Sequence, residues 1–378
     1  MTTPTYDVII VGAGIVGAAC AAEAVKAKLK TAIIEARIIG GGATAAGMGH
    51  LVVMDDSEAQ FALTRYSCKL WRELKDELPV PVEYDDCGTI WVATDDEEMA
   101  EVQRKEKYYR ERGIEVEVLD ARALTEAEPN LRQGLVGGLR VPNDSVIYPP
   151  CGAKFFIERA VAAGAALLLG KRVTSIEDGV THLHDGSSLS AGAIVNATGS
   201  WSPSLTPGID VKKRKGHLLI TDRYPKFLRH QLVELGYLKS AHSVTSDSVA
   251  FNIQPRKTGQ MLIGSSRQYG VESSEIDQGI MGRMLARAIE YMPRLNQLSS
   301  IRSWTGFRAA TPDKLPLIGP DLRKNRLYLA TGHEGLGITT SVGTARLLFD
   351  QLLARSSEIP FEPYLPHRDG TDVGNARA

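Results

Sequence analysis

The sequence is poor in cysteine, and its cysteines form no metal-binding pattern. Four are present, at positions 20, 68, 87 and 151, without C-x-x-C spacing or paired histidine ligands. Structural zinc and iron–sulfur sites need closely spaced ligands, so we expect no metal site within this chain. A reducing, cytoplasmic setting is the default for a chain that uses cysteine in this way.

The sequence also lacks an excess of charge and any long apolar run. Its formal net charge is −1, so bulk electrostatics do not indicate nucleic acid or an anionic membrane as a partner. No apolar run approaches the roughly 20 residues that span a bilayer, and the N-terminus has no signal-type apolar core. We expect a soluble protein, whose 378 residues suffice for two domains or one elaborated domain.

A glycine-rich turn near the N-terminus is the clearest motif. Asp7–Val11 predicts a strand, and Gly12, Gly14 and Gly17 follow it in G-x-G-x-x-G spacing. In such a turn the glycines allow a tight reversal, a close approach of the backbone to a pyrophosphate, and close packing of helix on strand. The helix that follows favours negative charge at its N-terminus. Its expected apolar face consists of Ile15, Ala18, Ala19, Ala22 and Val25.

An acidic residue follows at the spacing of a dinucleotide site. Residues 31–34 predict a second strand, which ends at Glu35, 18 positions after Gly17 (35 − 17). A carboxylate about 20 residues after such a turn accepts a hydrogen bond from a ribose hydroxyl. An ordinary glycine turn with a solvated glutamate is the alternative. The order of strand, turn, helix, strand and acid favours an adenine dinucleotide.

Two more glycine-rich segments indicate a larger cofactor. Residues 40–49 are almost only Gly, Ala and Thr, which lets the backbone lie against a flat ligand while Thr44 offers a hydroxyl to a phosphate. A flexible linker is the alternative. Residues 327–337 predict another strand and glycine loop before a helix. Two helix N-termini aimed at one ligand suit a cofactor whose ring system also requires a positive dipole.

The middle of the chain predicts a second sheet. Residues 216–222, 248–255 and 260–267 are typical of strands in a largely antiparallel sheet. Residues 193–199 predict an apolar strand that returns to the dinucleotide sheet, so insertions interrupt the nucleotide domain. Residues 95–112 predict a charged, solvated helix without functional meaning, and a disordered tail is expected from Pro366.

Five ordered motifs resemble the D-amino-acid oxidase family of FAD-dependent amine oxidoreductases, in its glycine oxidase and sarcosine oxidase branch. Within that family, residues 42–51, 215–218 and 304–308 resemble most the FAD-bearing subunit of D-hydroxyproline dehydrogenase, with opine oxidase subunits a close second. The five motifs are residues 12–17, 42–48, 196–201, 306–319 and 332–338.

The resemblance implies an α/β fold with two domains. A Rossmann-type FAD-binding domain would comprise residues 1–80, 145–209 and 311–365, followed by a tail over 366–378. A substrate-binding domain with a mainly antiparallel sheet flanked by helices would comprise residues 81–144 and 210–310. The implied reaction oxidises a cyclic D-amino acid, cis-4-hydroxy-D-proline being favoured, to the imine by hydride transfer to flavin N5.

The resemblance also implies roles for individual residues. Arg308 stands in the family's G-x-R position, where a guanidinium pairs with the substrate carboxylate; an interdomain salt bridge is the alternative. His333 is expected at the flavin edge, with a loop histidine bonded to backbone as the alternative. The other residues expected near the reacting atoms are Asn252, Arg267, Met48 and His50. The residues expected to bind FAD are Gly12, Gly14, Ile15, Val16, Gly17, Glu35, Ala36, Ala43, Thr44, Ala46, Gly47, Met48, Val173, Ala197, Thr198, Gly199, Trp201, Gly306, Gly332, His333, Gly335, Leu336, Gly337, Ile338 and Thr339.

Three departures from the family pattern bear on the substrate and the cofactor. Asn252 replaces an aromatic Tyr of glycine oxidase-like sequences, and Arg267 falls near a position that they fill with Met. A more polar pocket would suit a substrate with an extra hydroxyl or carboxylate, unless both are surface strand residues. Sarcosine oxidases attach their flavin through a C-terminal cysteine, and the last cysteine here is Cys151, so we expect non-covalent FAD.

Several functions stay open at this point. The favoured one is a dehydrogenase in a hetero-oligomer whose partner subunits carry the electrons onward. An opine oxidase subunit and a glycine or sarcosine oxidase-like enzyme that reduces O₂ are the enzymatic alternatives. A nicotinamide dehydrogenase or a structural nucleotide-binding subunit would leave the second glycine loop and Arg308 unexplained.

Overall fold

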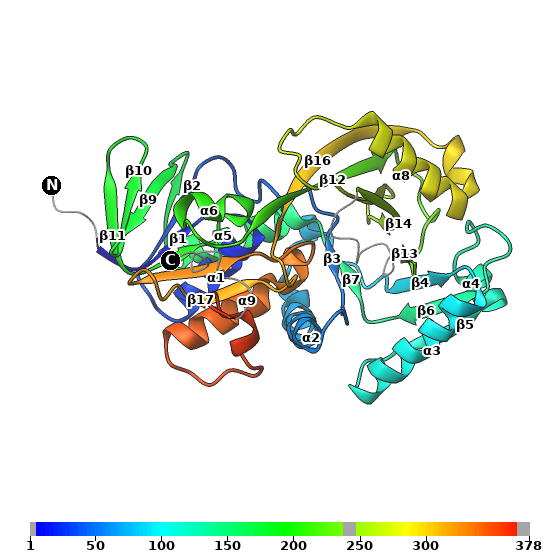
Figure 1. Ribbon diagram of the computed structural model, residues 1–378, viewed down its shortest axis with the longest axis horizontal. Coiled ribbons are helices and arrows are strands. Elements are labelled where there is room, and N and C mark those ends of the chain that lie inside the picture. The colour runs from blue at the N-terminus through cyan, green and yellow to red at the C-terminus, as the bar shows by residue number, and fades with distance from the viewer. Residues whose placement is uncertain (1–4, 237–246, 369–378) are drawn as a thin grey trace, which may run out of the picture. The chain divides into compact units, whose positions relative to one another are not determined.

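The structure is a computed structural model and describes residues 5–236 and 247–368 (Figure 1). These residues form two compact units. Unit 1 comprises residues 5–82, 148–213 and 307–368, and unit 2 comprises residues 83–147 and the described part of 214–306. The expected domain boundaries differ from these by four residues or fewer. Which unit binds cofactor and which binds substrate remains a prediction.

Unit 1 is built on a mostly parallel sheet with strand order β17-β18-β11-β1-β2-β8. Strands β1, β2, β8, β11 and β18 run parallel, and the edge strand β17 runs antiparallel to β18. Off this path, β10 pairs antiparallel with β11 and with β9. The pairing of β11 with β1 confirms that the late apolar strand returns to the dinucleotide sheet. The strands are β1 (Thr5–Val11), β2 (Thr31–Glu35), β8 (Ala166–Leu169), β11 (Ser188–Asn196), β17 (Leu317–Pro320) and β18 (Leu327–Thr331).

Helices and a small antiparallel layer cover the two faces of this sheet (Figure 1). Helix α1 (Ile15–Lys26) packs against both α5 (Pro149–Ala162) and α9 (Gly337–Leu352). Because α1 has neighbours on two sides, it buries Ala21 and Ala24, whereas Ala22 and Val25 of the expected apolar face are only partly buried. The remaining elements of unit 1 are β3 (His50–Leu51), α2 (Glu58–Leu74), η1 (Lys75–Glu77), η2 (Val80–Val82), β9 (Val173–Glu177), β10 (Val180–Leu183), η3 (Gly199–Trp201), α6 (Ser202–Leu205) and η5 (Glu362–Tyr364).

Unit 2 is built on a sheet with strand order β16-β12-β15-β14-β13-β4-β6-β5. The neighbouring pairs from β12 to β5 run antiparallel except β13 and β4, which run parallel. The predicted α/β class, with a mainly antiparallel second sheet, is therefore confirmed. Its strands are β4 (Thr89–Ala93), β5 (Glu117–Asp120), β6 (Gly137–Val141), β12 (Lys212–Thr221), β13 (Gln231–Glu234), β14 (Ser248–Pro255), β15 (Met261–Arg267) and β16 (Ser300–Ala310), with the short β7 (Ser145–Val146) outside the sheet order above.

Helices lie on this sheet as well. The core of unit 2 forms where Met284 and Tyr291 of helix α8 (Gln278–Tyr291) pack on Phe251 and Ile253 of β14. Helix α3 (Asp96–Glu111) is not the fully solvated helix that its charges predicted, because Lys105 is buried with its ammonium 4.9 Å from the ring of Trp91. The other helices are α4 (Ala121–Ala127) and η4 (Pro293–Gln297).

The C-terminal end of the described chain corrects one expectation. Arg368 pairs with the carboxylate of Asp313 and donates to the carbonyl oxygens of Leu315 and Pro316. The segment after Pro366 is therefore held to unit 1 as far as residue 368, and the rest of the expected tail lies outside the described residues.

Two classes of feature are absent from the described residues. No helix that they form is both long enough and apolar enough to cross a bilayer. Nor do three or more His, Cys, Asp or Glu side chains come together there in a way that could hold a metal ion.

Candidate active site

The first glycine turn is fixed by close contacts of the backbone. Gly12 has φ +102°, and a Cβ added there would lie 2.7 Å from the carbonyl oxygen of Ala197. A Cβ at Gly17 would lie only 2.0 Å from the carbonyl oxygen of Gly12. Real Cβ atoms do not tolerate such distances, so both positions require glycine where β1 turns into α1 and meets the end of β11.

The N-terminus of α1 receives a side chain from the second glycine loop. The hydroxyl oxygen of Thr44 accepts a hydrogen bond from the backbone nitrogen of Ile15 at 3.0 Å. A Cβ at Gly14 would lie 3.3 Å from the same hydroxyl oxygen. Thr44 is buried, and its hydroxyl can still donate one hydrogen bond. It lies at the N-terminus of α1, where the helix dipole places partial positive charge. Thr44 therefore joins two of the predicted segments, and Val16 follows Ile15 in the first turn of α1.

Glu35 lies at the end of β2, as predicted, and its carboxylate is already engaged by backbone. One oxygen accepts from the nitrogen of Ala13 at 2.8 Å and the other from the nitrogen of Arg37 at 2.7 Å. Each carboxylate oxygen accepts more than one hydrogen bond, so these contacts orient the group and leave acceptor sites open for a hydroxyl. The neighbouring Ala36 is exposed.

The second glycine loop lies against three other parts of unit 1. A Cβ at Gly47 would lie 2.7 Å from the Cδ1 of Ile338 in α9, and a Cβ at Gly42 would lie 3.2 Å from the ring of Trp201. The backbone nitrogen of Gly40 donates to the carbonyl of Ala13 at 2.8 Å. The segment is thus a packed loop rather than a flexible linker. Ala43 and Ala46 lie within it and are exposed and partly buried, respectively.

Polar side chains at the end of β11 bind one another and the neighbouring backbone. Asn196 accepts from the hydroxyl of Thr198 at 2.7 Å, and its amide nitrogen donates to the hydroxyl of Thr206 at 2.9 Å. The hydroxyl of Thr331 donates to the carbonyl of Gly199 at 3.0 Å. The predicted residues Ala197, Thr198 and Gly199 therefore follow β11 beside the first turn, and a bond from β18 to the start of η3 holds Gly199.

The late glycine loop also requires glycine for its geometry. Gly332 has φ +78°, and a Cβ there would lie 2.6 Å from the methyl carbon of Thr311. A Cβ at Gly337, the first residue of α9, would lie 3.9 Å from the Cγ2 of Val16. The N-termini of α1 and α9 therefore lie close together at the carboxyl edge of the parallel sheet, with Leu336 as the residue before α9.

His333 points into the protein. Its ring is buried, and Nε2 lies 2.9 Å from the hydroxyl oxygen of Thr344 in α9. Burial lowers the pKa of His333 to about 3, so the ring is neutral at physiological pH. The ring therefore anchors the loop to α9, and any contact with a cofactor at this position would come from the backbone.

Arg308 lies beside the late glycine loop. A Cβ at Gly335 would lie 3.6 Å from the Nε of Arg308, and the backbone nitrogen of Glu334 donates to the carbonyl of Ala309 at 2.8 Å. The end of β16 thus runs along the loop that precedes α9. The side chain of Arg308 therefore lies next to the late glycine loop, which was expected from the sequence to contact the flavin ring.

Met48 and His50 lie close to the start of α9 as well. The hydroxyl of Thr339 donates to the carbonyl of His50 at 2.8 Å, and Met48 is buried. Burial lowers the pKa of His50 to about 3. Trp71 of α2, which was not predicted as a site residue, donates from its indole nitrogen to the carbonyl of Thr339 at 3.0 Å. Its place in an ordinary amphipathic helix gave no signal of this contact.

Two predicted residues, Asn252 and Arg267, belong to unit 2. Asn252 on β14 pairs in register with Gly264 on β15, whereas Arg267 pairs with Ser248, four residues before Asn252. Asn252 is buried, and its side-chain oxygen accepts no hydrogen bond from the described residues. Gly306 is the last residue of unit 2 on β16.

One predicted cofactor residue lies in a core. Val173 on β9 is buried among Ile9, Ile34 and Leu183 of the sheet and its antiparallel layer. Its side chain is thus occupied by packing, and a cofactor contact at this position would again come from the backbone.

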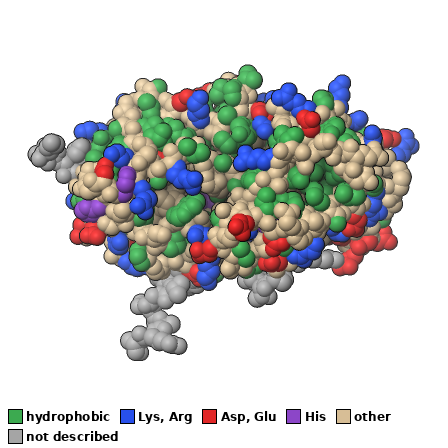
Figure 2. Space-filling model, turned by 90° about the horizontal axis from the view of Figure 1, so that it is seen from above, with side chains coloured by type: hydrophobic (Ala, Val, Ile, Leu, Met, Phe, Trp, Pro, Cys, Tyr) green, Lys and Arg blue, Asp and Glu red, His purple; other side chains and the backbone are tan. Residues whose placement is uncertain are grey.

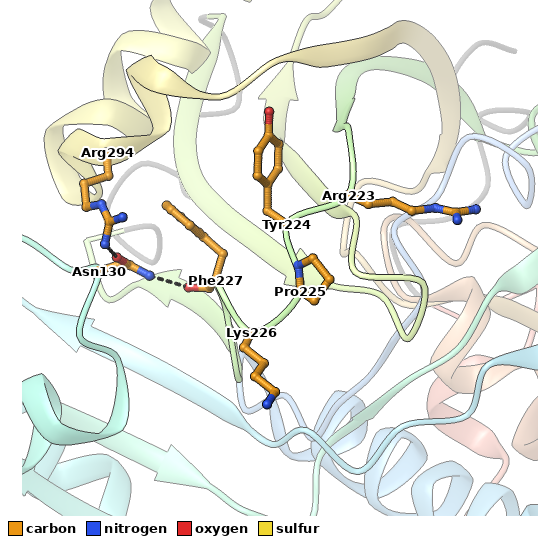
Figure 3. Close-up of a pocket in the computed structure, with 7 residues that line it drawn as sticks. All are labelled: Asn130, Arg223, Tyr224, Pro225, Lys226, Phe227 and Arg294. Atoms are coloured by element: carbon orange, nitrogen blue, oxygen red, sulfur yellow. Dashed lines mark hydrogen bonds between the residues drawn. The ribbon is translucent and has the colours of Figure 1, made fainter.

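A pocket of about 440 Å³ lies elsewhere in unit 2 (Figure 3). Arg294 donates to Asn130, which donates to the carbonyl of Phe227, at 2.7 Å in each case. Figure 3 shows the side chains of Arg223, Lys226 and Arg294 pointing in different directions rather than at one point. The pocket contains none of the predicted residues, and its cations do not converge as an anion site requires.

Charged side chains of both signs lie among hydrophobic and other side chains on the face that Figure 2 shows. This mixed surface agrees with the formal net charge of −1.

The residues of unit 1 fit an extended dinucleotide. Glu35 presents a carboxylate, the backbone cradle at Gly12 and Gly14 would be filled by a Cβ, and Thr44 presents a hydroxyl at the start of α1. The start of α9 offers a second positive helix end beside Arg308. FAD has the matching ribose, diphosphate and ring system.

Comparison with known proteins agrees with this geometry. A family described as FAD dependent oxidoreductase (DAO) matches residues 7–351. Glycine oxidase of Geobacillus kaustophilus is 28% identical over 98% of this chain and 99% of its own length. The crystal structure of glycine oxidase from that organism matches with a TM-score of 0.87 and 27% identity, over 97% of this chain and 99% of that one.

Two further relatives differ in their names. Hydrogen cyanide synthase subunit HcnC of Pseudomonas aeruginosa is 27% identical over 96% of both chains. D-amino acid dehydrogenase of Methylobacterium nodulans is 28% identical over 79% of this chain and 71% of its own length.

Proposed function

Because the chain belongs to the family of FAD-dependent oxidoreductases, we propose that it oxidises the amine of an amino acid, and that its substrate is a cyclic D-amino acid, cis-4-hydroxy-D-proline being favoured. Relatives named glycine oxidase and D-amino acid dehydrogenase support an amino-acid substrate. The resemblance of residues 42–51, 215–218 and 304–308 to D-hydroxyproline dehydrogenase supports the cyclic one.

The position of Arg308 is the observation that carries this proposal. Its Nε would lie 3.6 Å from a Cβ at Gly335, so the side chain lies along the loop that opens α9. A guanidinium there binds a carboxylate through two parallel hydrogen bonds, which fixes the orientation of the amino acid. Once the carboxylate is fixed, the α-carbon presents one hydrogen toward the cofactor, and this positioning accounts for much of the rate.

FAD supplies the electron-accepting chemistry when bound, and the protein supplies position and electrostatics. We propose that Glu35 accepts from the ribose, that Thr44 and the first turn of α1 hold the diphosphate, and that the backbone from Gly335 to Thr339 stabilises negative charge on the ring through the helix end. We propose non-covalent binding. Acid precipitation should leave a colourless protein pellet and a yellow supernatant.

The polar residues of unit 2 would recognise the hydroxyl of the substrate. Asn252 carries a buried side-chain oxygen without a partner among the described residues, and Arg267 is partly buried at the end of β15. Asn252 offers an amide oxygen and nitrogen where Tyr offers a single hydroxyl, and Arg267 offers a guanidinium where Met offers only a weak sulfur acceptor. We propose that this polarity distinguishes hydroxyproline from proline.

We further propose that partner subunits take the electrons onward. The relative HcnC is by name a subunit of a larger enzyme, which supports this arrangement. An enzyme that reduces O₂ by itself is the competing proposal, supported by the two glycine oxidase comparisons. Turnover with O₂ alone, compared with turnover with an artificial dye, separates the two proposals.

The decisive experiment is anaerobic bleaching of the bound flavin by a panel of amines. The panel comprises cis-4-hydroxy-D-proline, D-proline, L-proline, sarcosine, glycine and an opine. We expect the fastest bleaching with cis-4-hydroxy-D-proline. Faster bleaching by glycine or by an opine would replace the proposed substrate, and a protein that takes up no FAD would refute the proposal altogether.

The role of Arg308 has its own test. Arg308→Lys should lower kcat/KM for D-proline about a hundredfold, because a bidentate pair worth roughly 3 kcal/mol is lost. Pyrrolidine, which lacks the carboxylate, should be oxidised equally well by both proteins. Arg302→Lys on the exposed part of the same strand is the matched control and should leave kcat/KM unchanged. Equal losses with D-proline and pyrrolidine would assign Arg308 to structure instead.

A further inference from the structure

Arg267 lies between two residues that are firmly held in unit 2. Ser266 and Gln268 are 1% and 3% exposed, whereas Arg267 between them is partly buried. Both neighbours are bound by the segment Lys215–His217 of β12, which lies within residues 215–218 that resemble D-hydroxyproline dehydrogenase. This arrangement, which we call the β12 clamp, consists of Lys215, His217, Ser266, Gln268 and Asp277.

His217 holds the first neighbour. It is fully buried, and its Nδ1 lies 2.9 Å from the hydroxyl oxygen of Ser266, which also accepts from the backbone nitrogen of His217 at 2.9 Å. Its Nε2 accepts from the backbone nitrogen of Asp277 at 3.0 Å. Since Nε2 must be unprotonated to accept, the ring proton is assigned to Nδ1, which donates to Ser266.

Lys215 holds the second neighbour through the backbone. Its nitrogen donates to the carbonyl of Gln268 at 3.1 Å, and the nitrogen of Gln268 donates back to its carbonyl at 2.9 Å. The amide nitrogen of Gln268 donates to the carboxylate of Asp277 at 3.1 Å, and the ammonium of Lys215 donates to the carbonyl of Glu275. The chain is therefore fixed on both sides of Arg267, the last residue of β15, by contacts that reach the N-terminus of α8.

Because Ser266 and Gln268 are both held, the side chain of Arg267 points to a fixed face of the sheet. Successive side chains of a strand point to opposite faces, so fixing Ser266 fixes the face of its neighbour. A guanidinium has a long, flexible stem, and holding its backbone lowers the entropy that is lost when it binds. A charged donor held in this way is suited to a hydroxyl or carboxylate of a small substrate.

We propose that His217 is a positioning residue, which through Ser266 directs Arg267 at the second polar group of the substrate. This proposal rests on the proposed function, because it takes the substrate to carry a hydroxyl or carboxylate beyond its α-carboxylate. His217 itself does not touch the substrate. Its bond to Ser266 is the one that matters for recognition, and its bond to Asp277 only caps α8.

Two substitutions separate these bonds. Asparagine places its amide near the Nδ1 of histidine, so His217→Asn keeps a donor for Ser266 and loses the acceptor for Asp277. Glutamine places its amide near Nε2, so His217→Gln keeps the acceptor for Asp277 and loses the donor for Ser266. A merely structural histidine would make the two variants equally impaired.

We expect His217→Gln to raise KM for cis-4-hydroxy-D-proline about tenfold, the effect of one hydrogen bond to an orienting group, with kcat changed less than twofold. His217→Asn should restore KM to within twofold of the natural protein. KM for D-proline, which lacks the hydroxyl, should be unchanged in both variants. Melting temperatures measured alongside show whether both variants fold.

A double-mutant cycle tests whether His217 acts through Arg267. In an Arg267→Gln background, His217→Gln should have no further effect on KM, because the group it positions is gone. Additive effects, equal losses with both substrates, or equal losses in the Asn and Gln variants would each overturn the proposal.

Failure of the proposed function is visible separately. The flavin of the natural protein would then be bleached by other amines and not by cis-4-hydroxy-D-proline. The same variants are in that case measured with the best two substrates of the panel that differ by one polar group. An unchanged KM ratio for that pair in His217→Gln would overturn the positioning role, whichever substrate is correct.

Discussion

The glycine turn of unit 1 and the β12 clamp of unit 2 hold their candidate residues in different ways. In the turn, backbone lies so close to backbone that a Cβ at Gly17 would be 2.0 Å from a carbonyl oxygen. In the clamp, β12 binds residues about fifty positions later through a side chain at His217, whose ring contacts Ser266 of β15, and through the backbone at Lys215. The glycine turn depends on the absence of side chains, because its glycines carry no Cβ. The clamp depends on specific hydrogen-bond donors and acceptors.

The difference explains why the two regions tolerate change unequally. The packed glycine turn cannot accommodate an added side-chain atom, because moving the closely packed backbone costs about 3 kcal/mol of stability. A hydrogen-bonded clamp loses one bond at a time, usually about 1 kcal/mol each. We therefore expect cofactor binding to respond to substitution in an all-or-none way and substrate recognition to respond by degrees.

The largest effect is expected from Gly17→Ala. The added methyl group must displace the carbonyl of Gly12, so the variant should lose FAD and unfold more readily, by roughly 3 kcal/mol or more. Flavin absorbance and urea unfolding measure both losses. Gly282→Ala in α8, where a Cβ would meet open space, is the control and should be neutral or slightly stabilising. A Gly17→Ala protein that keeps its flavin colour and its stability would show that the backbone of the turn can accommodate the methyl group.

The next effect concerns pH and the late glycine loop. The pKa of His333 is lowered to about 3 in the folded protein, below its ordinary value of 6.5. The unfolded chain therefore takes up the proton first, and the free energy of unfolding should fall as the pH drops from 6.5 towards 3, by up to about 1.4 kcal/mol per pH unit.

Urea midpoints measured from about pH 7 to about pH 5 test this expectation. His333→Gln removes the titrating ring, so its unfolding free energy should fall less steeply over this window. Curves of equal slope for the two proteins would show that His333 is not held neutral by the fold.

A smaller effect is expected at the start of α1. Thr44→Val removes the hydroxyl that accepts from Ile15, and it should weaken FAD binding about tenfold, the effect of one hydrogen bond to a charged group. Thr44→Ser keeps the hydroxyl and should bind FAD normally. Fluorescence titration of the apoprotein with FAD gives both constants. Equal affinities in the two variants would exclude Thr44 from the phosphate site.

The smallest effect should come from Asn252. Its buried side-chain oxygen has no partner among the described residues, so Asn252→Ala should leave the melting temperature unchanged or raise it slightly. KM for cis-4-hydroxy-D-proline should rise several-fold, and KM for D-proline should not. Unchanged steady-state kinetics with both substrates would remove Asn252 from the site and weaken the contrast between the two units.

Much of unit 1 was predictable because its signals are local. The strand before Gly12, the helix after Gly17 and the acid at Glu35 all follow from short spacings, and the structure shows them in that order. The buried Lys105 of α3 was not predictable, because its charge suggests solvent until the rings of Trp91 and Tyr109 are known to lie over it. The inward turn of His333 depends likewise on Thr344, which follows eleven residues later on another element.

The sequence by itself determined the cofactor class and the α/β fold, since glycine sterics and strand periodicity act over a few residues. Only the tertiary structure decided what Arg308, Thr44 and His217 touch: the loop before α9, the nitrogen of Ile15, and Ser266. Those contacts join segments separated by tens of residues. They depend on strand register and on packing between elements, which no short pattern of residues encodes.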